Sequence, residues 1–79
     1  MRIDKYLKLS RIIKRRTIAQ EACDAGRVMI NNKVAKASTD VKIGDVIEIR
    51  FGEQTTKYEV VQIKEHVKKE ETADLYRIV

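Results

Sequence analysis

The sequence predicts an α+β fold, a small single domain in which two N-terminal helices precede a small, mainly antiparallel sheet. Apolar residues at helical spacing are confined to the first third of the chain, and short apolar runs between turn residues fill the rest. With 79 residues, the chain has room for one domain and for no separate catalytic domain. The order of these patterns, helices before strands, therefore defines the fold class.

The first predicted helix spans residues 3–9 and carries Asp4 near its start, where a carboxylate can cap it. Ile12 and Ile13 follow it and are expected to turn inward while their basic neighbours face solvent. The apolar side of this helix consists of Ile3, Tyr6 and Leu7.

The second predicted helix begins at Thr17, which forms a Thr-x-x-Gln capping box with Gln20. It ends at Gly26, because a left-handed residue commonly closes a helix and glycine adopts that conformation freely. Its buried side is predicted from four residues at helical spacing, which are Ile18, Ala19, Ala22 and Cys23.

Strands are predicted where β-branched and aromatic residues concentrate between turn residues. Asn31 and Asn32 form a turn, since asparagine is among the few residues that accept a positive φ. Residues 64–74 are charged and fit either a loop or one helical turn. The expected strands are residues 28–30, 34–35, 46–51, 58–63 and 75–79, with a tight turn at 41–45 and a hairpin loop at 52–54.

Charge is distributed unevenly along this chain of net charge +5. Residues 1–36 hold ten Lys/Arg against three Asp/Glu, whereas residues 37–79 hold seven against nine. Four of the eight residues from Ser10 to Thr17 are cationic. A small protein that keeps such dense positive charge usually binds a polyanion, so we expect a nucleic-acid-binding face.

The apolar runs, the N-terminal residues and the single cysteine predict the cellular compartment of the protein. The longest purely apolar run is three residues, Val28–Ile30, far short of the roughly 20 that span a membrane. The first five residues lack the apolar core of a signal peptide, and Cys23 has no partner for an internal disulfide. These observations predict a cytoplasmic protein with no membrane partner.

The candidate RNA-binding residues fall into three groups. Four cations precede the second helix, whose free N–H groups favour phosphate, and arginine adds bidentate geometry. A second group gives the first helix a basic face, and a third extends along the following hairpin. The full set is Arg11, Lys14, Arg15, Arg16 and Thr17, then Arg2, Lys5 and Lys8, then Arg27, Asn31, Lys33 and Lys36.

Catalysis and metal binding find little support in the sequence. His66 stands alone in a charged segment, without a second ligand at metal spacing or a nucleophile beside it. Cys23 fits the apolar helix side, and Asp4 fits a cap that also orients Arg2 or Lys5. We therefore expect no enzyme, no cofactor and no metal. The aromatic residues are scattered in core or strand positions, which favours structured over single-stranded RNA.

Three segments together resemble the S-four RNA-binding domain family, named after small-subunit ribosomal protein four. They are Arg2–Leu7, Arg16-Thr17 and Ala25–Lys33. Arg15 stands where this family commonly has serine, and Asn32 where it commonly has glycine. The resemblance covers about residues 1–50, so residues 51–79 are expected to be a C-terminal strand extension of the same domain.

The likeness extends to free-standing members of the family, partly through Lys68–Glu71 followed by Tyr76. It implies a non-catalytic monomer that binds rRNA, and tRNA, on a large ribosomal subunit carrying a stranded peptidyl-tRNA. It further implies ribosome-associated quality control, with a tailing factor as partner and alanine tailing of the nascent chain. The alternatives are a heat-shock-type ribosome recycling factor and a basic adaptor for an acidic protein.

Overall fold

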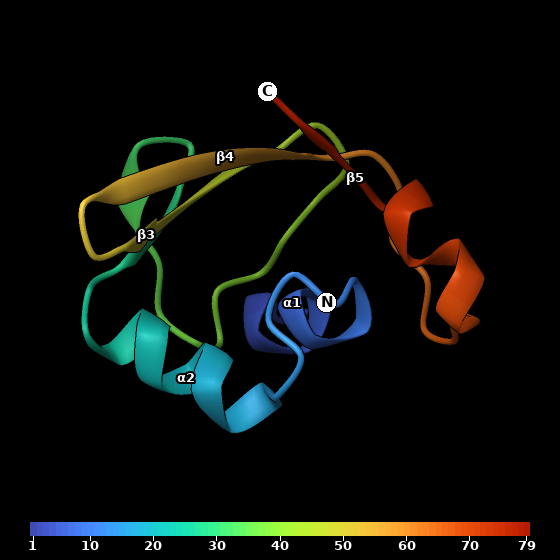
Figure 1. Cartoon of the computed structure of the whole chain (residues 1–79), viewed down its shortest axis with the longest axis horizontal. Helices are drawn as coiled ribbons and strands as arrows, with labels where there is room; N and C mark the ends of the chain where they lie inside the picture. The colour runs from blue at the N-terminus through green and yellow to red at the C-terminus, as the bar shows by residue number, and fades with distance from the viewer.

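An antiparallel five-stranded sheet forms one layer of the structure and two helices form the other (Figure 1). The computed structural model describes all of residues 1–79. The strand order is β2-β1-β3-β4-β5, and both helices lie on the same side of the sheet. The elements are α1 (Ile3–Leu9), α2 (Arg16–Asp24), β1 (Val28–Ile30), β2 (Lys33–Val34), β3 (Val46–Phe51), β4 (Gln54–Val60), the 3₁₀ helix η1 (Lys69–Asp74) and β5 (Tyr76–Ile78). This arrangement confirms the predicted α+β fold.

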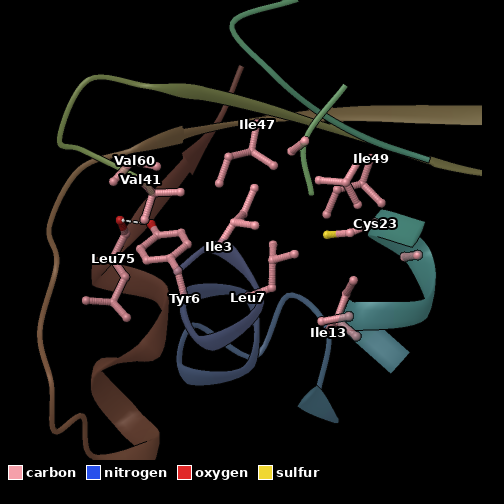
Figure 2. Packing of buried hydrophobic residues seen from close by; sticks show 14 residues of the cluster. Ile3, Tyr6, Leu7, Ile13, Cys23, Val41, Ile47, Ile49, Val60 and Leu75 are labelled. Carbon is pink, nitrogen blue, oxygen red and sulfur yellow. Dashed lines mark hydrogen bonds between the residues drawn. The ribbon is translucent and has the colours of Figure 1, made fainter. Parts of the chain in front are cut away.

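The core lies between α1, α2 and the inner face of the sheet (Figure 2). Successive side chains of a strand point to opposite faces, so Ile47 and Ile49 of β3 both point inward, where Leu7 of α1 is also fully buried. Tyr6 joins the N-terminal helix to the end of the chain, because its hydroxyl donates a 2.6 Å hydrogen bond to the carbonyl of Leu75. The C-terminal segment is thus tied directly to α1.

The residues that cap the two helices at their N-terminal ends differ from the prediction. α1 has the expected bounds, but Arg2 occupies the N-cap position and Asp4 lies inside the first turn, so the predicted Asp4 cap is wrong. α2 begins at Arg16, with Arg15 at the N-cap and no side-chain cap bond, so the Thr17–Gln20 capping box is wrong too. The physical reason is a tertiary contact, since the Gln20 amide donates to Asp4 instead.

The buried side of α2 is narrower than predicted. Ala19, Ala22 and Cys23 are buried as expected, at the i, i+3, i+4 spacing of one helical stripe. Ile18 is 42% exposed, which contradicts its predicted core position. It lies at the edge of that stripe, about 100° around the helix from Ala19. Ile13 is buried and Ile12 packs against the core, as predicted.

The strands follow the predicted order with shifted ends. β3 matches its predicted range, and Asn31 and Asn32 form the expected turn with positive φ values of 49° and 68°. β4 runs from Gln54 to Val60 rather than over 58–63, because a tight turn at residues 52–53 lets polar residues continue the ladder with β3. The ambiguous segment 64–74 contains η1. None of the helices has the length and apolar character needed to cross a membrane.

Candidate RNA-binding surface

A fully covered carboxylate, Asp4, organises the centre of the basic surface. Its Oδ2 accepts hydrogen bonds from Arg2 Nη2 at 3.2 Å and from Arg16 Nε at 3.3 Å. The Gln20 amide donates to the same oxygen at 3.0 Å, while Oδ1 accepts from the Lys5 backbone N–H at 2.8 Å. One acidic side chain therefore holds two arginines, from the start of α1 and the start of α2, in fixed positions.

Both arginines keep their outer surface free. The side chain of Asp4 has no solvent-exposed surface, whereas the Arg2 and Arg16 side chains are 51% and 44% exposed. The guanidinium groups thus cover the carboxylate and present their remaining N–H groups to solvent. Such oriented donors suit phosphate oxygens or guanine edges.

The charge state of Asp4 follows from these contacts. Burial raises the pKa of its carboxyl, but hydrogen bonds from Gln20, Arg16 and the Lys5 amide outweigh this effect, so the pKa lies below its ordinary value. Asp4 is therefore ionised at neutral pH and keeps its hold on both arginines.

The other predicted cations of α1 are separated from this pair. Lys5 extends toward the C-terminal segment and pairs with Glu65, and this contact holds the pKa of the Glu65 carboxyl below its usual range. Lys8, Arg11 and Lys14 line a surface hollow of about 280 Å³ beyond the end of α1. The three cations predicted to form the basic face of the first helix thus have separate surroundings. Lys5 forms an ion pair with Glu65, Arg2 is bound to Asp4, and Lys8 lines this hollow.

The start of α2 presents further exposed groups. Arg15 is the N-cap residue and Thr17 lies in the first turn, and both are exposed. The N-terminal turn of α2 therefore displays a cation and a hydroxyl beside the free N–H groups of the helix. Together with Arg16 they form the phosphate-favouring arrangement expected from the sequence.

The hairpin residues have different surroundings. Lys36 and Arg2 line the same surface hollow near the end of α2. Arg27 lies with Arg50 and Glu48 beside another hollow, and Lys33 is exposed on the edge strand β2.

The side chain of Asn31 is engaged within the fold. Its amide donates to Asp45 and its oxygen accepts the Val46 N–H, so the side chain fixes the start of β3.

Sequence reasoning missed one cation that the fold brings to this surface. Lys69 of η1 lines the hollow with Lys8, Arg11 and Lys14, although it is 55 residues from the nearest of them in sequence. The pair Lys68-Lys69 was a signal of positive charge, but its position beside α1 depends on the tertiary fold. Gln20 was assigned to the capping box of the second helix, whereas its amide donates to Asp4 at the centre of this surface.

Groups that could support catalysis are not brought together. No three His, Cys, Asp or Glu side chains lie close enough to hold a metal ion. Cys23 is buried, and burial raises the pKa of its thiol to about 11, so it stays protonated and a poor nucleophile at neutral pH. His66 is exposed in the segment before η1.

Comparison with known proteins agrees with the fold. The S4 domain family model matches residues 1–47, which contain α1, α2, β1, β2 and the Asp4 contacts. The chain therefore belongs to the S4 domain family. The match ends within β3, so the rest of the sheet and η1 lie beyond the family's shared region.

Particular relatives share the full length of the chain. It is 52% identical over 79 residues to the RQC P-site tRNA stabilizing factors of Streptococcus pneumoniae and Bacillus subtilis, spanning 90% and 92% of those proteins. Among solved structures it is similar to heat shock protein 15 of Vibrio cholerae, described as trimeric, with a TM-score of 0.90 and 31% identity. That likeness covers all of this chain and 81% of the Vibrio chain.

Proposed function

We propose that this protein is a non-catalytic RNA-binding factor of ribosome-associated quality control. In this role it binds rRNA of the large ribosomal subunit and contacts the P-site tRNA of a stalled peptidyl-tRNA. It acts in the cytoplasm as a monomer, and by stabilising that tRNA it supports alanine tailing by the tailing factor of the pathway. The names of full-length relatives at 52% identity support the pathway, and membership of the S4 family supports RNA binding.

The observation that carries this proposal is the pair of arginines held by Asp4. Two guanidinium groups from two helices are oriented before any ligand arrives, which reduces the entropy lost on binding. A fixed pair of this kind suits a folded RNA of defined shape, such as rRNA helices or tRNA, better than a flexible strand.

The direct test is sedimentation of a tagged copy from cells through a sucrose gradient, with and without RNase treatment. The proposal predicts co-migration with free large subunits that carry peptidyl-tRNA, and loss of that co-migration after RNase. If the protein stays in the light fractions, the ribosomal assignment fails. A complex that survives RNase would instead indicate a protein adaptor.

Ribosome recycling is a second candidate, because the fold matches heat shock protein 15 of Vibrio cholerae along the whole chain. The two candidates differ in the state of the nascent chain. Deletion of the gene in cells with stalled ribosomes would abolish alanine tails if the protein acts in quality control. Intact tails, together with accumulated free large subunits bearing peptidyl-tRNA, would favour recycling.

A further inference from the structure

The hollow beyond α1 is built from two parts of the chain that are distant in sequence. Its α1 side contributes Lys8, and the following loop contributes Arg11 and Lys14. Its other wall comes from the C-terminal segment, with Lys69 and Thr72 of η1. Figure 1 shows η1 beside α1, where the hydrogen bond from Tyr6 to Leu75 ties the two together.

The charges around this hollow are one-sided. Four of the seven lining residues are cationic and none is acidic. None of the four cations lies within 4 Å of a carboxylate, unlike Lys5 and Lys64, which pair with Glu65 and Glu71. Glu65 and Glu71 thus form ion pairs with cations that do not line the hollow. Four unpaired positive charges around one depression repel one another, and a bound anion would offset this repulsion.

The backbone at Arg11 supports a role in binding. Its φ of 62° lies in the left-handed region, which glycine adopts without steric penalty and which arginine adopts rarely. A glycine would close α1 at lower energy, yet the chain keeps a long cation there. Residues held in such conformations cluster at ligand-binding sites.

We propose that this hollow binds a phosphate of the RNA backbone, with Lys69 of η1 completing a four-cation site. The inference rests on the proposed RNA-binding function and extends it to the C-terminal segment, beyond the region that the S4 domain model matches. A phosphate fits the chemistry because its oxygens accept from several N–H groups at once. The C-terminal extension is then an RNA-contacting element as well as a structural one.

The test compares Lys69→Ala with Lys68→Ala, a matched loss of charge at an exposed neighbour that does not line the hollow. The probe is the purified large ribosomal subunit with tRNA in its P site. We expect Lys69→Ala to weaken binding about fivefold and to reduce the log–log salt slope by about 0.7–0.9, the value for one lost phosphate contact. Lys68→Ala keeps the wild-type affinity and slope, and thermal melting confirms that both variants fold.

Each result decides between the hollow and the wider function. If the wild type binds the subunit and the two variants bind equally, the hollow is not a phosphate site, although the proposed function stands. If the wild type does not bind the subunit, the proposed function fails, and labelled tRNA alone becomes the probe. Weaker tRNA binding by Lys69→Ala than by Lys68→Ala then supports the hollow. Equal or absent tRNA binding overturns it.

Discussion

Arg2 and Arg16 share one covered carboxylate, whereas Lys8, Arg11 and Lys14 have no carboxylate within 4 Å. In the first region, the negative charge of Asp4 offsets part of the positive charge of Arg2 and Arg16 and fixes the direction of their N–H donors. The second keeps its full charge, because no carboxylate pairs with its cations. Under the function we propose, this difference assigns two physical tasks in RNA binding: fixed donors define the orientation of the complex, and unpaired cations supply the salt-dependent attraction to phosphate.

Loss of the Asp4 carboxylate should have the largest effect on the fold. Asp4→Asn replaces one acceptor oxygen by an N–H₂ group that faces the donors of Arg16 and Gln20. We expect the free energy of unfolding to fall by about 1–3 kcal/mol, as for other disrupted hydrogen bonds to a covered charged group. Urea denaturation followed by circular dichroism measures this change.

Asp40→Asn is the matched control, because Asp40 is exposed and pairs only with the N-terminal ammonium. Exposed ion pairs contribute little to stability because water screens them, so this variant should unfold close to the wild type. Equal destabilisation by the two substitutions would show that Asp4 is an ordinary surface acid and would remove the distinction between the two regions.

The two regions should also respond differently to exchange of arginine and lysine. Arg16→Lys keeps the charge but loses the Nε donor to Asp4 and the planar guanidinium, so affinity for large subunits should fall about tenfold. Lys14→Arg, in the unpaired region, should bind within about twofold of the wild type because only charge is needed there. Filter binding at fixed salt compares the affinities of the two variants. Wild-type affinity of Arg16→Lys would contradict the claim that the fixed direction of the Arg16 donors matters for binding.

Acid should remove the contribution of Asp4 to stability. Because the pKa of Asp4 is lowered in the folded state, the unfolded chain takes up a proton first as the pH falls. The stability difference between the wild type and Asp4→Asn should be complete near about pH 6 and should narrow below the ordinary pKa of 3.8. A difference that stays constant down to acid unfolding would mean that Asp4 has no depressed pKa.

The smallest effect is expected on the sheet face opposite the helices. Lys57 of β4 pairs with Glu48 of β3 at 3.7 Å, and Glu48 alternates with the inward-facing Ile47 and Ile49. Lys57→Ala should leave affinity for large subunits unchanged within about twofold, although it removes one positive charge, as Lys14→Ala does. A loss equal to that of Lys14→Ala would indicate that total charge, and not its position, determines binding.

Local signals in the sequence predicted much of the fold. The apolar spacing of α1, the alternation in β3, and the positive φ of Gly26, Asn31 and Asn32 all depend on residues close together in the chain. These elements appear where the sequence placed them.

The errors concern contacts between distant residues. Gln20 fitted a local capping box, yet its amide reaches Asp4, 16 residues away. Ile18 was assigned to the core from its helical spacing, but it is exposed, because packing alone determines which side of α2 faces the core. Lys69 joins the basic surface through the fold of η1 against α1, which no periodic pattern indicates.

The sequence predicted which residues form the candidate site, but not the contacts that hold them together. The sequence identified the cations near the two helices, and Asp4 as a residue that orients Arg2 or Lys5. It could not show that one carboxylate holds both Arg2 and Arg16, because the two arginines are 14 residues apart and meet only when α1 packs against α2.

The most direct test of this organisation is the affinity of Asp4→Asn and Asp40→Asn for large ribosomal subunits with P-site tRNA, measured where both variants are folded. Each variant gains one unit of positive charge, so attraction by net charge alone predicts tighter binding for both. The account predicts that Asp4→Asn binds about tenfold more weakly, because the released arginines must be ordered again on binding, while Asp40→Asn binds at least as well as the wild type. Asp4→Asn binding as tightly as Asp40→Asn would contradict it.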